Sequence, residues 1–503
     1  MVARLSARGV IVDKRALLKQ ASFGAQVAEE EVDNLQRYFV ETDQWNRIHG
    51  GSTDIVYGAK GSGKSALYAL LGSSSSAGDG AVVPVLGEQL RGSAAFSAVV
   101  EDPPTSEREF VALWKAYVLT LVGRLMQERK AHGSDAKKVL KMLAQEGLLV
   151  GDDAGLPGIL RRVQQYARRR VSVEPKIQTP DSVTFSLALT LDEPTAAQRE
   201  AGAVSIDSLL GTADDALAEL GIKAWILLDR LDVAFYESPD LEQAALRALF
   251  HVYLDNLRLK RIRLKIFIRT DIWDRITDEG FREASHITRD DTIKWDKASL
   301  MNLLVRRLLD NAGVCTFLKI DKEKVLASAR EQQEVFYRVF PAQVDVGAKK
   351  PSTFDWMLKR VADGKGVVAP RELIHLVNAA REEQIRLMEM GQAEPSDELL
   401  LSRDAIKTAL VEVSEKRLQQ TLFAENADLK PYIKLLDGDK TEQTPDTLAV
   451  AWSFGTDEAQ RVAAKLVDVG FFELKGTKQA PIYAVPFLYR SAAHMIQGKA
   501  KVN

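Results

Sequence analysis

Short apolar runs alternate with segments of helical periodicity over the first 295 residues. The runs TDIVY, AVVPVL, AWILLD, RLKIFIRT and TIKW predict strands at about 53–57, 81–86, 224–229, 263–270 and 292–295. Residues 105–130, 205–221 and 238–259 repeat apolar positions with the helical period. Because strands that alternate with helices form parallel sheets covered on both faces, we predict an α/β core over residues 51–295. Residues from about 134 to 204 break the pattern and are interpreted as an insertion.

The strand pattern stops near residue 296, where amphipathic helical patterns begin and continue to about residue 390. The stretch MGQAEPSDE, 390–398, has the composition of a linker. Beyond it, a helix near 457–469 precedes two short strands joined by a polar loop, which is the outline of a winged helix. We therefore expect an N-terminal segment (1–50) leading into the core, an all-helical lid (296–390) and a C-terminal winged-helix domain (399–503).

The octapeptide GAKGSGKS, 58–65, fits the pattern G-x-x-x-x-G-K-[ST] between a predicted strand and a predicted helix. Glycines let the backbone wrap closely around phosphates, which backbone N–H groups and the helix N-terminus then bind. Lys64 is expected to reach the β- and γ-phosphates of ATP, and the Ser65 hydroxyl to ligate Mg²⁺. The predicted nucleotide-binding residues are Gly58, Ala59, Lys60, Gly61, Ser62, Gly63, Lys64, Ser65 and Ala66.

The stretch ILLDRLD, 226–232, is an apolar strand that ends in two aspartates. A P-loop protein needs a carboxylate at the end of a neighbouring strand to hold Mg²⁺, and Asp229 has that position. Many P-loop ATPases follow it with a glutamate that polarises the attacking water, whereas this chain has Arg230. Asp232 is the nearest carboxylate able to act as the base. The alternative is that Asp232 only caps the turn, and the protein then binds ATP but hydrolyses it slowly.

Two arginines are candidates for contact with the nucleotide. Arg269 ends the strand IFIR, at the sheet edge where doubly wound folds bind their ligands, and it is a candidate contact for the γ-phosphate. An ion pair with an acid such as Asp271 is the alternative. Arg371 follows Pro370 at the start of a predicted helix, whose apolar stripe packs while the arginine points to a nucleotide. An ordinary solvated arginine is the alternative there.

Composition excludes several classes of protein. A net charge of -2 and a pI near 6.4 exclude a chain that is basic overall, so contact with nucleic acid requires a local patch. The single cysteine, Cys315, excludes an internal disulfide and a cysteine-rich zinc site. No segment approaches the roughly 18 apolar residues of a membrane span, and the N-terminus lacks the apolar run of a signal peptide. We therefore expect a cytoplasmic protein with no membrane partner.

The order of these features resembles the AAA+/STAND group of P-loop ATPases, and most closely its bacterial origin-recognition-like (initiator-like) members. The segments FGAQVAEEEVDNLQRYFVETDQWNRI, TIKW, APRELIHLVNAA and IYAVPFLYR strengthen the resemblance. It implies that ATP and Mg²⁺ bind between the core and the lid, with Asp229 and Asp232 as Walker B, Arg269 as sensor 1 and Arg371 as sensor 2. Arg230 departs from the glutamate of standard AAA+ proteins, and the DxxD form is nearer to STAND-type switches.

Basic residues gather in two regions. The C-terminal one carries Arg461, Lys465, Lys475, Lys478, Arg490, Lys499 and Lys501. The other, RRVQQYARRRVSVEPK at 161–176, includes Tyr166, which we expect to stack on a base. Both favour an ATPase whose nucleotide state sets how its winged helix meets double-stranded DNA. The alternative is a STAND-like switch that uses ATP to control a homo-oligomer or a protein partner, for instance in defence against phage, without DNA.

Overall fold

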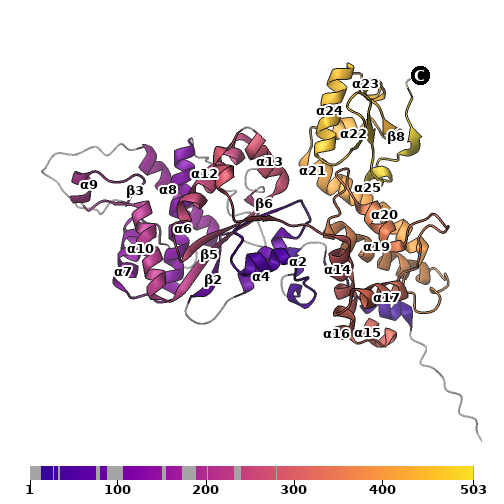
Figure 1. Cartoon of the computed structure of the whole chain (residues 1–503), viewed down its shortest axis with the longest axis horizontal. Helices are drawn as coiled ribbons and strands as arrows, with labels where there is room; N and C mark the ends of the chain where they lie inside the picture. Colours follow the sequence, from indigo (N-terminus) through magenta and orange to yellow (C-terminus); the bar gives the residue numbers. More distant parts are fainter. Residues whose placement is uncertain are drawn as a thin grey trace, which may run out of the picture. The chain divides into compact units, whose positions relative to one another are not determined.

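The computed structural model describes residues 13–25, 28–31, 34–74, 80–87, 106–149, 155–172, 189–200, 202–231, 239–278 and 280–501. They form two compact units, a core unit of residues 41–294 and a second unit that joins residues up to 40 with residues 295–503. Figure 1 labels their helices and strands. The segment expected over residues 1–50 therefore divides at Val40. The division after Lys294 coincides with the end of the apolar strand pattern.

The core unit is built on a five-stranded parallel sheet, which confirms the predicted α/β class. Its strands are β1 (Ile55–Gly58), β2 (Ala81–Leu86), β5 (Ile222–Leu228), β6 (Ile262–Arg269) and β7 (Asp290–Thr292). They lie in the order β2-β5-β6-β1-β7, and every pair is parallel. Because β6 separates β1 from β5, the carboxyl ends of these three strands are neighbours at one edge of the sheet.

Helices cover both faces of this sheet. Ile55 and Tyr57 of β1 share one buried cluster with Ile226 of β5 and with α6 (Glu107–Glu128), α10 (Ile206–Glu219) and α12 (Pro239–Asn256). The opposite face meets α4 (Lys64–Ser73), where Tyr68 packs edge-on against Phe267 of β6 with the ring centroids 5.9 Å apart. The other helical segments of this unit are α3 (Asp43–His49), α13 (Thr270–Asp278) and η3 (Arg282–His286).

The segment expected as an insertion supplies part of the same core. It contains α7 (Ser134–Gln145), α8 (Gly155–Ser172), β3 (Leu189–Thr190), α9 (Ala196–Glu200) and β4 (Val204–Ser205), and β3 pairs with β4. Ile159, Val163 and Tyr166 of α8 are buried against α6. Burial of Tyr166, whose hydroxyl donates to the carbonyl of Leu189 at 2.9 Å, makes the predicted stacking of this ring on a base wrong.

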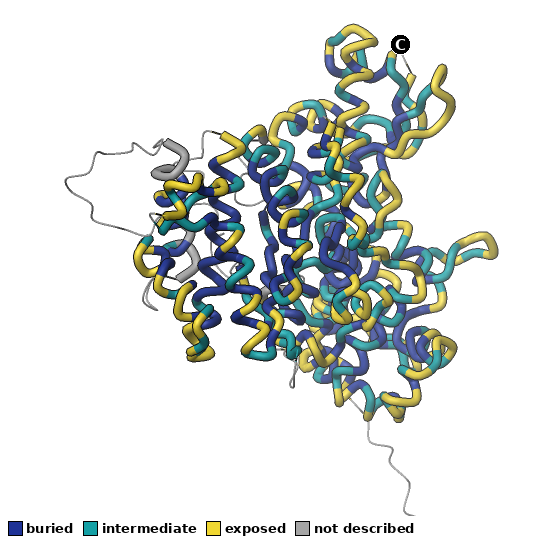
Figure 2. The backbone as a smooth tube through the Cα atoms, turned by 60° about the vertical axis from the view of Figure 1, so that its left-hand side comes forward, coloured by how far each residue is buried: buried dark blue, intermediate teal, exposed yellow. Residues whose placement is uncertain are grey.

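The second unit combines helices with a four-stranded sheet in one buried cluster. The helical segments that precede this sheet in the chain are α1 (Lys14–Gln20), α2 (Ala28–Glu31), η1 (Leu35–Arg37), α14 (Lys297–Leu309), α15 (Ala312–Leu318), α16 (Lys322–Leu326), α17 (Ala329–Val339), α18 (Thr353–Val361), α19 (Pro370–Glu389), α20 (Arg403–Arg417), η4 (Leu418–Leu422), α21 (Phe423–Glu425) and α22 (Lys430–Lys434). The sheet region adds β8 (Lys440–Gln443), α23 (Pro445–Trp452), α24 (Thr456–Asp468), β9 (Glu473–Gly476), β10 (Pro481–Ala484), α25 (Phe487–Arg490) and β11 (Ile496–Lys499). A helix followed by a two-stranded hairpin is present at α24, β9 and β10, as the sequence predicts. Figure 2 shows exposed stretches around this end of the chain.

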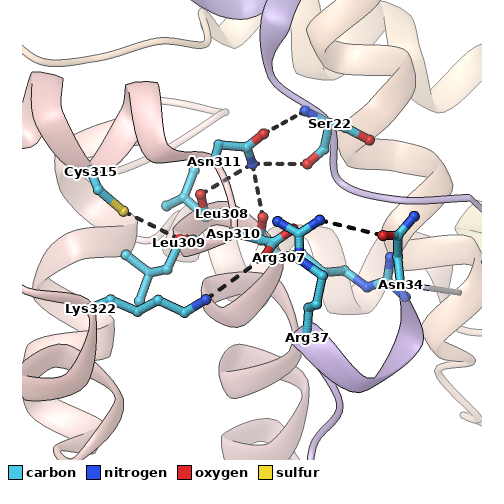
Figure 3. A network of polar contacts seen from close by, with 10 residues as sticks. All are labelled: Ser22, Asn34, Arg37, Arg307, Leu308, Leu309, Asp310, Asn311, Cys315 and Lys322. Atoms are coloured by element: carbon cyan, nitrogen blue, oxygen red, sulfur yellow. Dashed lines mark hydrogen bonds and ion pairs between the residues drawn. The ribbon is translucent and has the colours of Figure 1, made fainter.

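The described residues between 13 and 40 pack on the helices of the second unit. Asn311 accepts a hydrogen bond from the Ser22 N–H at 2.7 Å and donates to the Ser22 carbonyl at 2.9 Å (Figure 3). Arg37 pairs with Asp310 at 3.2 Å, and Lys322 lies 3.7 Å from the same carboxylate. These contacts fix the N-terminal segment to the turn between α14 and α15.

A buried ion pair reinforces that attachment. The Arg307 guanidinium binds both oxygens of Glu31, at 3.0 and 2.9 Å, and donates to the carbonyl of Phe23 at 2.6 Å. Both side chains of the pair are 5% exposed, and Arg307 stacks on Tyr38 with 4.4 Å from the guanidinium carbon to the ring centroid. Each charge offsets the desolvation of the other, so removal of one partner would leave an uncompensated buried charge.

The stretch expected as a linker is held at several points. The Lys14 ammonium donates to the carbonyls of Pro395, Asp397 and Leu399 at 2.7, 2.6 and 3.1 Å. Arg338 binds Glu398 through two hydrogen bonds of 2.6 and 2.9 Å. The connection between α19 and α20 is therefore tied to both the N-terminal segment and α17.

No helix among the described residues is both long enough and apolar enough to cross a membrane.

Candidate nucleotide-binding site

The predicted phosphate loop forms the turn between β1 and α4. Its backbone takes positive φ at Gly61 (78°) and Gly63 (103°), a region that side chains with a Cβ rarely adopt. A Cβ at Gly58 would come within 2.4 Å of the Ser62 Oγ. The helix begins at Lys64, directly after Gly63 as its N-cap, so its first N–H groups face the loop. These glycines thus give the turn a shape that suits the binding of an anion.

Lys64 folds back over this loop. Its ammonium donates to the carbonyl oxygens of Gly58 and Ala59 at 2.7 and 3.1 Å. The positive charge of Lys64 therefore lies at the start of the loop, and the positive end of the α4 dipole adds to it. A bound phosphate would offer the same ammonium a charged acceptor, which makes a stronger hydrogen bond than a neutral carbonyl.

The structure brings the two predicted Mg²⁺ residues together. The Ser65 hydroxyl, in the first turn of α4, donates to Oδ2 of Asp229 at 2.9 Å. Asp229 follows β5 directly and is 3% exposed. A hydroxyl beside a carboxylate supplies the oxygen ligands that Mg²⁺ prefers, and one or two such protein ligands are usual when phosphates and water complete the shell. The residues present therefore fit a magnesium site.

The residues after Asp229 are described only in part. Arg230 stands where a glutamate is common, and it has a positive φ of 58°. Leu231 is buried and begins the next turn. Asp232, the predicted base, lies outside the described residues, as do residues 233–238. Its role stays a prediction from the sequence.

Arg269 lies at the same edge of the sheet as the loop. It ends β6, and its Cα is the register partner of Gly58 in β1. Its guanidinium donates to both oxygens of Asp271, at 3.0 and 2.8 Å. Burial alone would raise the pKa of the Asp271 carboxyl, but the Arg269 guanidinium outweighs it, and the pKa lies below its usual value. The alternative given in the sequence analysis, an ion pair between Arg269 and Asp271, is thus present, and Arg269 lies next to the loop.

Arg371 belongs to the second unit, at the start of α19. Its guanidinium donates to Oε1 of Glu372 at 3.3 and 3.0 Å and to the hydroxyl of Thr421 at 3.4 Å. Arg417 donates to the same Oε1 at 2.9 Å. Burial opposes the charge of Glu372, but Arg417 and Arg371 keep the pKa of this carboxyl below its usual value. The sequence analysis missed this carboxylate, although it directly follows Arg371 in the first turn of the helix.

Four basic side chains of the C-terminal region are exposed. Arg461 and Lys465 lie one helical turn apart on α24, and Lys475 and Lys478 lie in and beyond β9. Lys475 pairs with Glu473 at 3.0 Å, an exposed contact that solvent screens. These positions form one helix face and one hairpin that are accessible to a partner.

Comparison with known proteins gives only distant similarities. No protein-family profile matches the chain, and no curated protein matches it. A solved structure of a Walker-type ATPase of Pyrococcus abyssi is similar over 90% of this chain and 95% of that chain, with 11% identity and a TM-score of 0.39. The Orc1 protein of Aeropyrum pernix, solved in complex with DNA, is similar over 72% of this chain and 91% of that chain, with 12% identity and a TM-score of 0.29.

Proposed function

We propose that this chain is a P-loop ATPase of the AAA+ kind, related to the initiator-like ATPases that its sequence resembles. The observation that carries the proposal is the hydrogen bond between Ser65 and Asp229, which lie 164 positions apart in the chain. It joins the phosphate loop to the acidic end of a separate strand at one edge of a parallel sheet, and ATP–Mg²⁺ needs both parts.

Each residue then has a separate role. The loop N–H groups and Lys64 bind the phosphates, while Ser65 and Asp229 hold Mg²⁺, which neutralises phosphate charge when it is bound. Asp232 accepts the proton of the attacking water. Arg269 is the first sensor and contacts the γ-phosphate, and Arg371 is the second sensor of the nucleotide. Arg230, in the place of a glutamate, cannot act as a base, so we expect slow turnover.

We further propose that nucleotide controls the binding of double-stranded DNA by a C-terminal winged helix. The exposed basic side chains on α24 and on the β9–β10 hairpin support an electrostatic contact with DNA phosphates. The lid and the C-terminal sheet share one buried cluster, and the stretch between them is tied by Lys14. A lid that responds to nucleotide would thus carry the winged helix with it.

A STAND-like switch that acts on a protein partner or on self-assembly is the second candidate. The observation that favours it is Arg230, because without a neighbouring glutamate the ATP-bound state lasts longer. A change of oligomer size with ATP in the absence of DNA would support this candidate. Salt-dependent binding of duplex DNA would support the first, since phosphate contacts release counterions.

The deciding experiment measures ATP turnover by the wild type, Lys64→Ala and Asp232→Asn, each with and without duplex DNA. Lys223→Ala, an exposed lysine of β5, is the control for loss of a positive charge. We expect turnover that DNA stimulates and that the first two substitutions abolish. The switch would instead be favoured by two results together. ATP binding would depend on Lys64, and ATP turnover would be negligible and unchanged by DNA or by Asp232→Asn.

A further inference from the structure

Two arginines of the second unit stack on one phenyl ring. The guanidinium carbon of Arg360, at the end of α18, lies 3.7 Å from the ring centroid of Phe487. The guanidinium carbon of Arg490 lies 3.9 Å from the same centroid. Arg360 also stacks on Trp356 at 4.9 Å. Phe487 is 37% exposed, so the cluster reaches the surface of the protein.

The positive charge of this cluster is incompletely neutralised. Arg490 donates to two neutral acceptors, the Val485 carbonyl at 2.8 Å and the Gln497 side chain at 2.6 Å. No carboxylate of the described residues lies within ion-pair distance of it, although Glu442 and Glu473 act on it from farther away. Burial lowers the pKa of Arg490, and the charge of Arg360 lowers it further.

Arg360 has a carboxylate partner that it shares. Asp345 lies 3.6 Å from Arg360, 3.1 Å from Lys407 and 2.8 Å from the indole nitrogen of Trp356. One negative charge thus serves two cations at this point. Together with Arg490, the group keeps an excess of positive charge that an anion would relieve.

We propose that Arg360 and Arg490 together bind one backbone phosphate of duplex DNA. The inference rests on the proposed DNA binding and adds a contact outside α24 and the hairpin. A guanidinium presents a planar set of donors that matches phosphate oxygens, and stacking on Phe487 holds both groups in a fixed orientation. The cluster is close to the hairpin in the fold, because β10 pairs with β9 and ends three residues before Phe487.

The test is duplex binding by the full-length chain, measured by fluorescence anisotropy over a series of salt concentrations. The variants are Arg360→Gln, Arg490→Gln and the double variant. The control is Arg330→Gln, which removes an exposed arginine paired with Glu334 on α17 of the same unit. Melting temperatures show whether each variant is folded, and Arg490→Lys, which keeps the charge, replaces Arg490→Gln if the latter unfolds.

Each phosphate contact contributes about 0.9 to the slope of log affinity against log salt concentration. We expect each single substitution to weaken binding about tenfold at low salt and to lower the slope by less than about 0.9, because the other arginine still contacts the phosphate. The double variant should lower the slope by about 0.9, because both arginines hold one phosphate. Arg330→Gln should match the wild type, and Arg490→Lys should keep the slope while binding more weakly.

Three results would overturn the inference. An unchanged slope in the double variant of a wild type that binds duplex would remove this contact and leave the DNA-binding proposal intact. A double variant that lowers the slope by about 1.8, with about 0.9 lost in each single variant, would mean two separate phosphates. A wild type that binds no duplex would refute the proposed DNA binding itself.

Discussion

The contact between Ser65 and Asp229 predicts different effects of two substitutions on stability. Ser65→Ala removes the hydroxyl that donates at 2.9 Å to a carboxylate only 3% exposed. A hydrogen bond to a charged group contributes about 1.5–3 kcal/mol, and about 1 kcal/mol shifts the melting temperature of a unit of this size by about 2–4 °C. The nucleotide-free core unit should therefore melt about 3–12 °C lower. Asp229→Asn keeps an acceptor oxygen and removes a buried charge, so its melting temperature should fall less or rise.

The same two substitutions, Ser65→Ala and Asp229→Asn, should have the same effect on the Mg²⁺ dependence of ATP binding. In the wild type we expect Mg²⁺ to strengthen ATP binding, because Ser65 and Asp229 are the proposed ligands of the ion. Either substitution should abolish the difference between titrations of ATP with Mg²⁺ and with a chelator. Ser74→Ala is the matched control, since its hydroxyl bonds the Leu71 carbonyl at the far end of α4 and lies away from the loop.

Isothermal titration calorimetry and a thermal melt of the same samples separate the two effects. The reasoning fails if Asp229→Asn retains the full Mg²⁺ dependence of ATP binding, since Asp229 would then hold no metal. It also fails if Ser65→Ala leaves the melting temperature at that of Ser74→Ala, because the hydrogen bond would then contribute nothing.

Three further predictions concern the second unit. Arg307→Met leaves Glu31 as a buried unpaired charge and should lower the free energy of unfolding by about 3–5 kcal/mol, with Glu31→Gln in the same chain restoring part of the loss in denaturant titrations. Gly364→Ala brings a Cβ to 2.2 Å from a backbone carbonyl oxygen and should cost about 1–3 kcal/mol, whereas Gly455→Ala, with open space around it, should cost less, because it loses only the preference for glycine over alanine at the N-cap of α24. Lys14→Met removes three hydrogen bonds to the 395–399 carbonyls, so hydrogen exchange should accelerate there, and unchanged exchange would show that Lys14 does not hold this stretch.

Local patterns were sufficient to locate four strands and the loop of the core. β2 has the predicted bounds of 81–86, and β1, β5 and β6 differ from the predicted ranges by one or two residues. The fifth prediction, 292–295, was misplaced, because β7 is Asp290–Thr292 and shares only Thr292 with it. The proximity of Ser65 and Asp229 was also predictable, because the carboxyl ends of parallel strands share one edge of a sheet. The strands are visible in the sequence because a strand buried on both faces must be apolar along its length.

The partners of the arginines were harder to predict. Arg269 and Arg371 both bind a carboxylate within two positions in the chain, Asp271 and Glu372, and periodicity does not encode which rotamer a long side chain adopts. Tyr166 was misread for another reason. Its arginine neighbours suggested a surface, but Ile159, Val163 and Tyr166 are spaced by four and three positions, which is the stripe of a packed helix.

Composition also misses contacts between distant parts of the chain. The stretch MGQAEPSDE has the polar residues and the glycine and proline of a linker, yet Lys14 binds three carbonyls in and after it across more than 380 positions in the chain. No local window contains both partners. The same holds for Gly364, whose N–H donates to the carbonyl of Gly470 at 2.7 Å and so joins the loop after α18 to the turn before β9.

The contacts of Glu372 indicate how a movement of Arg371 would affect the second unit. Oε1 of Glu372 accepts from both Arg371 and Arg417, whereas Oε2 is buried and has no hydrogen-bond partner among the described residues. If Arg371 turned to a phosphate, Glu372 would keep its shorter bond to Arg417 and so would not become an unpaired buried charge. Releasing Arg371 therefore costs less than leaving Glu372 unpaired, and α19, α20 and the C-terminal sheet belong to one buried cluster.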